Sequence, residues 1–187
     1  MKDNPNIKDN EFKLRPFKDQ DYPGIVNLCN ILFPDHPISE TSLRYNDKIR
    51  EKKIRHQRFI WEKDNQIKAA TSFSNLSWSY HPQVFDIDIR VHPDFQGKGY
   101  GKTAYSYLMK ELKKFDPIKI FSYTHEPLKR AIRFLEDRGF KIKNKEKQSS
   151  LDLLKYDPND FTSTIKRTIN NNIRIINLIE FRSEDFD

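Results

Sequence analysis

The feature that most constrains this sequence is the position of its few glycines. The chain has 187 residues and only five glycines, and three of these, Gly97, Gly99 and Gly101, fall within five residues. Glycine adopts backbone conformations that other residues avoid, so the chain concentrates its most permissive backbone at one place. We expect a sharp loop there, and we expect the chemistry of the protein to lie close to it.

The glycines join a predicted strand to a predicted helix. Residues 85–91 alternate apolar and charged side chains, which is the period of a half-buried strand, and residues 99–115 carry apolar side chains at helical spacing. Backbone N–H groups that converge at the start of a helix bind phosphate groups, and Lys98 and Lys102 add positive charge. The spacing fits neither the Rossmann nor the Walker pattern. The sequence predicts an anion-binding loop at residues 96–102, with a plain surface turn as the alternative.

Two segments of this region resemble a known family. Residues 91–102, VHPDFQGKGYGK, resemble the acetyl-CoA signature V-x-P-x-x-[RQ]-x-x-G-x-[GA] of the GNAT superfamily of N-acyltransferases. Residues 131–140, AIRFLEDRGF, resemble the family segment A-x-x-F-x-E-x-x-G-F on the next helix. The resemblance covers the order of elements from about Phe12 to Leu154.

The resemblance implies acetyl-CoA as the cofactor and assigns backbone groups to it. Its pantetheine would pair with the strand at Ile89, Arg90 and Val91, and the N–H group near Val91 would polarise the thioester carbonyl. Its pyrophosphate would lie on the amides of the loop, which are those of Gln96, Gly97, Lys98, Gly99, Tyr100, Gly101 and Lys102.

The catalytic residues are less constrained by the sequence. An amine must lose a proton before it attacks a thioester, and Asp86 and Asp88 are candidate bases on the cofactor strand. A solvated polar face or an ion pair with Arg90 is the alternative role for these two carboxylates. The family usually has a tyrosine at the position of Leu135, where it assists the leaving thiolate. In this chain Tyr123 or a water molecule would assist instead, or the thiolate leaves unaided, or catalysis is impaired. Tyr123 is also interpreted as a core residue.

The whole pattern predicts an α/β (α+β) fold with a mixed, mostly antiparallel sheet of about seven strands and about four flanking helices. Strands are expected near 12–17, 58–63, 67–78, 85–91, 118–124, 140–147 and 149–154. Helices are expected after Asp19 or Asp21, from Ser39 to about Lys53, at 99–115 and from Leu128 to Gly139.

The sequence also suggests three regions. Residues 1–11 are expected to be a flexible N-terminus, residues 12–154 the acetyltransferase domain, and residues 155–187 an extension with a helix capped by Asp160 and a strand at 173–178. The extension resembles the start of a second copy of the domain. We expect either one half of a double-domain protein, or a shortened relative whose strand pairs within the chain or across a homodimer.

Several residues have both a core and a functional interpretation. Core packing is favoured for Cys29, Trp61, Trp78 and Tyr80, although the last three could line an acceptor pocket. The alternating lysines of residues 141–147 are interpreted as the solvated face of an edge strand, rather than as a nucleic-acid surface.

Composition limits the remaining functions. The net charge of +7 favours anionic ligands, the single cysteine gives no disulfide and no metal site is expected. No stretch reaches the roughly 18 apolar residues of a membrane helix, so we expect no membrane partner and a cytoplasmic location.

We therefore predict an N-acetyltransferase that transfers the acetyl group of acetyl-CoA directly to a small-molecule primary amine, with no nucleic-acid partner. The acceptor site is expected at the loop of residues 34–41, the second helix and the last hairpin. The alternative is a non-catalytic CoA-binding or interaction module of the same fold.

Overall fold

The computed structural model describes residues 13–147 and 149–171, and these divide between two compact units, Met1–Leu135 and Glu136–Asp187. The prediction of a domain that runs from residue 12 to residue 154 stays a prediction. The elements of the first unit, in chain order, are β1 (Lys13–Pro16), α1 (Tyr22–Leu32), α2 (Glu40–Lys48), β2 (His56–Lys63), β3 (Gln66–Asn75), β4 (Val84–Val91), α3 (Tyr100–Leu112), β5 (Lys119–Ser122) and α4 (Lys129–Glu136), whose last residue belongs to the second unit.

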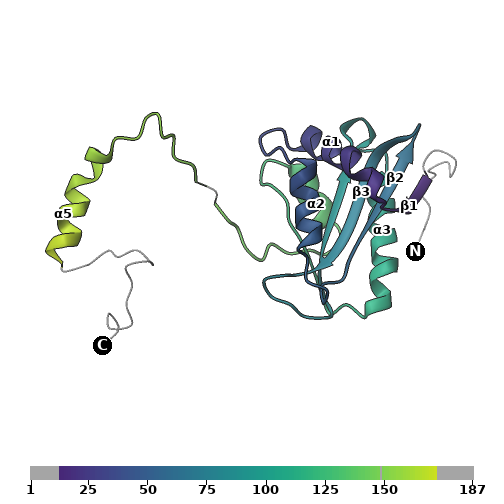
Figure 1. Cartoon of the computed structure of the whole chain (residues 1–187). Helices are drawn as coiled ribbons and strands as arrows, with labels where there is room; N and C mark the ends of the chain where they lie inside the picture. Colours follow the sequence, from purple (N-terminus) through teal and green to yellow (C-terminus); the bar gives the residue numbers. More distant parts are fainter. Residues whose placement is uncertain (1–12, 148, 172–187) are drawn as a thin grey trace. The chain divides into compact units, whose positions relative to one another are not determined.

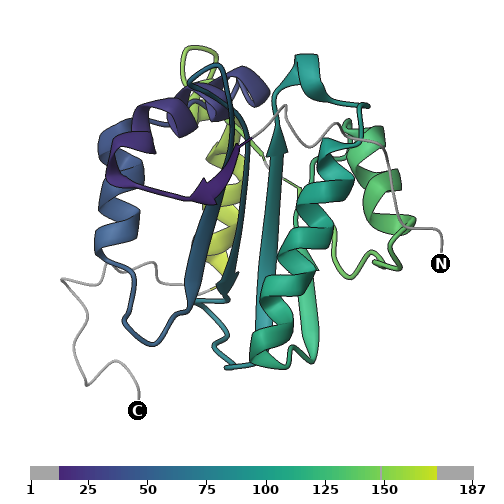
Figure 2. The same cartoon turned by 90° about the vertical axis from the view of Figure 1, so that its right-hand side faces the viewer.

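The five strands form one sheet in the order β1-β2-β3-β4-β5 (Figure 1). The first four strands are antiparallel, and β5 is parallel to β4 because α3 carries the chain back to the other end of the sheet. Helices α1 and α2 cover one face of the sheet, and α3 and α4 cover the other (Figure 2). The mixed sheet with helices on both faces is the predicted architecture.

The face toward α3 is the larger apolar core. Side chains at alternate positions of β2, β3 and β4 point to it, and aromatic rings join it to α3, since Tyr107 lies edge-on to both Phe59 and Trp61. The prediction that Trp61 is a core residue is confirmed, because its exposed fraction is 6%. The other buried side chains of this core include Phe73, Phe85, Ile87, Ala104, Leu108 and Leu112.

The face toward α1 has a smaller apolar core. Helix α1 begins after Asp21, with Pro23 in its first turn, and its apolar stripe packs on Ile60 and Ala70. Cys29 belongs to this stripe and is 3% exposed, as predicted. Asp21 is buried before the helix and accepts two hydrogen bonds from Arg15, which also pairs with Glu62.

Helix α2 is attached to the sheet largely through charge. Ser39 caps it by accepting a hydrogen bond from the Ser42 amide, as predicted, but the helix ends at Lys48 rather than near Lys53. No residue of α2 is buried. Its Asp47 instead accepts hydrogen bonds from Arg58 of β2, from Arg50 and from the Tyr22 hydroxyl. Leu43 adds a partly buried apolar contact and Arg44 pairs with Asp19, so Asp47 is the main but not the sole attachment of this helix.

The two strands predicted at Phe140–Lys147 and at Ser149–Leu154 are not formed. Residues 140–147 and 149–154 have no strand structure, and the side chains of residues 141–147 are exposed. The physical reason is that Ile142 alone among four lysines gives this segment no apolar face to bury. The described residues therefore contain five strands rather than about seven.

The second unit contains a helix where the extension was predicted to have one. This is α5 (Thr162–Asn170), which follows a 3-10 turn at Pro158–Phe161 and brings the α-helices in the described part of the chain to five. The predicted flexible N-terminus at 1–11 and the predicted strand at 173–178 lie outside the described residues.

Replacing Asp47 with asparagine should loosen α2. Burial alone would raise the pKa of Asp47, but hydrogen bonds from Arg58 and Arg50 outweigh it and lower that pKa to about 2. The carboxylate therefore stabilises the fold above about pH 4, and this contribution is lost as the pH falls through 2. We expect Asp47→Asn to lower the free energy of unfolding by roughly 1–3 kcal/mol at pH 7, measured by urea denaturation.

The matched control is Asp19→Asn, because Asp19 pairs with Arg44 across a more exposed contact in which the carboxylate is 84% exposed. That change should cost less than about 1 kcal/mol. Equal losses for the two variants would contradict the account of how α2 is held.

Candidate functional site

Strands β4 and β5 separate halfway along β4. Strand β3 pairs with β4 from Phe85 to Val91, whereas β5 pairs with it only from Val84 to Ile87, where Ser122 is the last partner. Within residues 13–147 and 149–171, no strand pairs with the other edge of β4 at residues 88–91. The sheet is therefore open on the β5 side of the second half of β4.

Hydrogen bonds show which backbone groups face this opening. The His92 amide donates to the Lys68 carbonyl on the β3 side, so by alternation the N–H groups of Ile89 and Val91 point to the β5 side. The Val91 carbonyl on that side accepts a hydrogen bond from the Gln96 side chain, at 2.9 Å. The edge at Ile89 and Val91 can thus pair with an extended ligand.

The glycine loop follows directly after this edge. A 3-10 turn at Pro93–Phe95 leads into Gly97 and Gly99, whose φ angles are +76° and +92°, and α3 begins at Tyr100. These two angles lie where other residues are strained, which explains the glycines. The Gln96 amide donates to the Pro93 carbonyl and the Lys102 amide to the Gly99 carbonyl, so the glycine amides between them are the ones suited to an anion.

Cations surround the loop from several elements. The Arg130 guanidinium of α4 lies 3.6 Å from the point that a Cβ atom on Gly97 would occupy. The Lys68 and Lys98 ammonium groups both lie over the Phe95 ring, at 5.5 and 5.4 Å from its centre. The sequence pattern indicated Lys98 but gave no sign of Arg130 or Lys68, because only the fold brings them to the loop. The charge and the exposed amides fit a pyrophosphate.

The second motif supports the first one. A Cβ atom on Gly101 would lie 3.4 Å from the Phe134 ring of α4, and Phe134 also lies edge-on to Tyr105 of α3. The phenylalanine of the A-x-x-F segment therefore packs against the first turns of the helix that follows the glycine loop. This contact explains why the two motifs occur together.

The charged side chains of β4 lie on the opposite face from the large core. Asp86, Asp88 and Arg90 alternate with the apolar residues and point to the side of α1 and α2. Arg90 forms an ion pair with Asp88, at 2.7 Å, and donates a hydrogen bond to the Cys29 sulfur. The ion-pair role that the sequence left open thus applies to Asp88.

Asp86 differs from its neighbour because no described residue forms an ion pair with it. Burial raises the pKa of Asp86 to about 6, and the nearby Asp88 raises it further against the opposing effect of Arg50. The pKa of Asp88 is also raised by desolvation in its recess, although 44% of the side chain stays exposed and Arg90 acts in the opposite direction. Asp86 is therefore the carboxylate suited to exchange a proton near neutral pH.

His56 is a site residue that the sequence analysis missed. It lies in the row His56, Ser74, Asp86 across three neighbouring strands, and neither of its buried ring nitrogens has a hydrogen-bond partner among the described residues. Desolvation, with Arg50 and Arg58 nearby, lowers its pKa to about 4. The neutral ring leaves Asp86 without a cationic partner in this row. No pattern in the sequence distinguishes this histidine from others.

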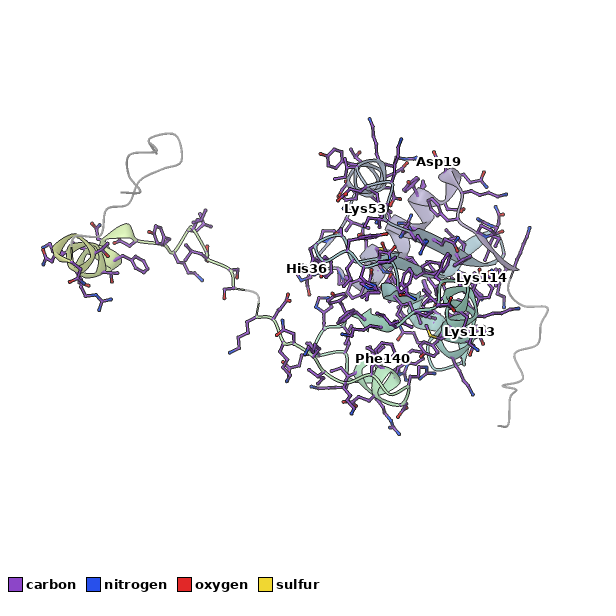
Figure 3. All side chains as sticks on the ribbon, turned by 90° about the horizontal axis from the view of Figure 1, so that it is seen from below. Asp19, His36, Lys53, Lys113, Lys114 and Phe140 are labelled. Atoms are coloured by element: carbon purple, nitrogen blue, oxygen red, sulfur yellow. The ribbon has the colours of Figure 1, made fainter. Side chains whose placement is uncertain are left out.

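The remaining predicted residues lie around the opening. Tyr123 follows the last residue of β5 and is 62% exposed, so the interpretation as a core residue is wrong. Its ring contacts Trp78, which is 70% exposed against expectation. His36, labelled in Figure 3, stacks on His125 and connects the loop after α1 to the segment after β5. Leu135, at the usual tyrosine position, lies near the end of α4.

The described residues contain no group of three or more histidine, cysteine, aspartate or glutamate side chains arranged to hold a metal ion. They also contain no helix long and apolar enough to cross a membrane.

The comparison with protein families decides the classification. The model of the acetyltransferase (GNAT) family matches residues 25–140, which is more than half of the chain and includes both motifs. The chain belongs to the GNAT family. Members of this family are acyltransferases, and the match begins in α1 and ends just after α4. A search of curated proteins gave no significant match.

Solved GNAT structures share the fold at low sequence identity. An acetyltransferase from Trypanosoma brucei has a TM-score of 0.55 and 22% identity, over 76% of this chain and 100% of that one. The ribosomal-protein-S18-alanine N-acetyltransferase from Escherichia coli has a TM-score of 0.54 and 18% identity, over 70% and 77%. An aminoglycoside acetyltransferase from an uncultured soil sample has a TM-score of 0.54 and 16% identity, over 78% and 98%. These likenesses establish the fold alone.

The loop geometry predicts different effects at two neighbouring glycines. Gly99→Ala places a side chain at a φ of +92°, which should cost about 1–2 kcal/mol and distort the loop. Gly101→Ala keeps an ordinary helical conformation and meets Phe134 at a normal contact distance of 3.4 Å. We expect Gly99→Ala to weaken CoA binding at least tenfold by calorimetry, and Gly101→Ala to keep it within about threefold. The reverse order would refute the role assigned to the loop backbone.

Proposed function

We propose that this protein is an N-acetyltransferase that transfers the acetyl group of acetyl-CoA directly to a primary amine. The proposal rests on the strand edge at Ile89 and Val91, which is unpaired on the β5 side among the described residues. This edge leads directly into the glycine loop, which has positively charged side chains around it. A ligand with an extended chain that ends in a pyrophosphate fits both the strand edge and the glycine loop. Asp86 lies on the same strand, with a pKa near neutrality.

The proposed reaction is a direct transfer, with no covalent enzyme intermediate. The bound thioester supplies the acetyl group, and its carbon–sulfur bond breaks as the amine nitrogen bonds to the carbonyl carbon. The Val91 N–H group donates a hydrogen bond to the carbonyl oxygen, where negative charge develops. One proton leaves the acceptor ammonium before attack and a second leaves the nitrogen afterwards, while the sulfur departs with one proton as the thiol of coenzyme A.

Asp86 is the proposed base for the acceptor nitrogen and acts through intervening water, because five residues of strand, roughly 16 Å, separate it from Val91. Its carboxylate is ionised above about pH 6, and it forms no ion pair that a proton would have to displace. Asp88 is a poorer choice, because Arg90 already holds its carboxylate. A positioned base of this kind contributes about 10²–10⁴-fold to the rate.

Tyr123 is the proposed proton donor for the leaving sulfur. Its position after β5 lies across the opening from the strand edge, while the side chain at 135 is a leucine that has no proton to give. The rival function, a CoA-binding module without catalysis, is supported by that leucine. It predicts cofactor binding with no thiol release for any amine.

Thiol release by the wild type separates the two functions, and Asp86→Asn tests the proposed base. We expect kcat/KM for thiol release to fall at least 100-fold and to lose the rise with pH that the wild type shows through about pH 6. CoA binding should stay within about threefold, because Asp86 points to the face opposite the core and not to the backbone edge. Unchanged turnover in this variant would exclude Asp86 as the base. Asp64→Asn, a change in the exposed turn between β2 and β3, is the control.

The same variant should be more stable than the wild type. A carboxyl whose pKa is raised by folding destabilises the fold once it is ionised, so this cost appears as the pH rises from about 4 to 6 and is constant above that range. The difference in unfolding free energy between Asp86→Asn and wild type should therefore grow over this range to on the order of 1–3 kcal/mol. His56 is present in both proteins, so the opposite effect of its titration cancels in this difference. A loss of stability at pH 7 would indicate a structural role instead.

A further inference from the structure

Two exposed aromatic rings lie in contact with each other next to the proposed acetyl-transfer site. Trp78 is 70% exposed and Tyr123 is 62% exposed, and their rings contact each other with centres 6.2 Å apart and planes 65° apart. Rings of this size usually bury most of their surface. An adjacent pair that stays accessible marks a place where a ligand or partner binds.

The register of the sheet places this ring pair beside the carboxylates. Phe121 of β5 pairs with Asp86 of β4, and neighbours in a parallel pair point to the same face. Tyr123, two residues further on, lies just past Ser122, the last paired residue. The chain there runs along the face that carries Asp86, because His125 contacts Phe33 and His36 after α1. The ring pair and the unpaired carboxylate thus share one face of the sheet, at the point where β4 and β5 separate.

The loop that carries Trp78 is held in place by a buried amide. The Asn75 side chain is 2% exposed, and its nitrogen donates to the carbonyls of His81 and Val84 while its oxygen accepts from the Arg55 amide. Leu76, the next residue, is also buried. These contacts fix both ends of the segment between β3 and β4, so Trp78 is presented from an anchored loop.

The charges near the rings select among kinds of amine. Of the aspartates nearest to β4 on this face, Asp47 is paired with arginines and Asp88 with Arg90, whereas Asp86 forms no ion pair with any described residue. A polycationic aminosugar needs several carboxylates for its several ammonium groups, whereas one ammonium is matched by one carboxylate. The rest of the ligand then meets aromatic surface, on which flat rings stack and cations are also attracted.

Building on the proposed function, we propose that the acceptor is a primary amine with an aromatic ring, whose ammonium group is attracted by Asp86 through intervening water and whose ring packs on Trp78 and Tyr123. Trp78 is then the residue that determines acceptor specificity. It contributes binding surface and takes no part in proton transfer.

The test compares amines that share an ammonium group and differ in the rest. Thiol release is measured with phenethylamine, butylamine, kanamycin and a short peptide that begins with alanine. We expect kcat/KM for phenethylamine to exceed that for butylamine at least tenfold. We expect Trp78→Leu to reduce this ratio at least fivefold, mainly through KM, and Trp78→Phe to retain most of it. A higher kcat/KM for kanamycin or the peptide than for phenethylamine would overturn the proposal.

The control is Tyr45→Leu. Tyr45 is 60% exposed on α2, on the side of the helix away from Leu43 and Asp47, which face the protein. It should leave the phenethylamine-to-butylamine ratio unchanged. Thermal unfolding is recorded for all three variants. If Trp78→Leu lowers the midpoint and leaves the ratio unchanged, then Trp78 serves packing and the proposal is wrong.

A binding measurement separates this inference from the proposed reaction. Trp61 is buried, so saturable quenching of tryptophan fluorescence by phenethylamine that disappears in Trp78→Leu reports on the exposed ring. Such quenching without any thiol release would support the aromatic-amine site and refute the transferase. Thiol release with no preference for aromatic amines would support the transferase and refute the aromatic-amine site. An absence of both quenching and thiol release would overturn both proposals.

Discussion

The site depends on one asymmetry in the sheet, which is that β4 is paired along one edge almost throughout and along the other edge only as far as Ile87. The full pairing with β3 keeps the strand straight and fixes its alternation. The partial pairing with β5 exposes main-chain groups at Ile89 and Val91 that would otherwise be used within the sheet. Because the strand then runs into a loop whose glycines have positive φ angles, one continuous stretch of backbone offers first an edge for pairing and then amides for an anion.

Because side chains alternate along the same strand, one face of β4 packs in the apolar core and the other face carries carboxylates. Phe85 and Ile87 complete the apolar core under α3, while Asp86 and Asp88 lie on the side of α1 and α2, where ion pairs adjoin the smaller apolar core. Arginines neutralise Asp47 and Asp88 on that face, and only Asp86 is left with a raised pKa and no cation. A residue that opposes folding at neutral pH is expected where chemistry, rather than stability, requires it.

The sequence predicted the parts of the fold that follow from local patterns and from the motifs. The period-two alternation located β4, the helical stripes located α1 and α3, and Ser39 located the cap of α2. It failed at residues 140–147, where alternating lysines satisfied the strand pattern without an apolar face to bury, and at residues 149–154, which also form no strand. It also failed for Trp78, because residue type favours burial and only the fold shows that an anchored loop holds this ring outside the core. Arg130 and His56 reach the site through tertiary contacts alone, so no spacing rule could indicate them.

Amide hydrogen exchange with and without acetyl-CoA tests the central claim most directly, because the claim concerns individual backbone groups. Slower exchange is predicted at Ile89, Val91 and the glycine amides of residues 97–101 when acetyl-CoA is added. Amides on the opposite edge of β4, which already donate to β3, should change little. Protection confined to other parts of the chain, or no protection at saturating acetyl-CoA, would contradict the account.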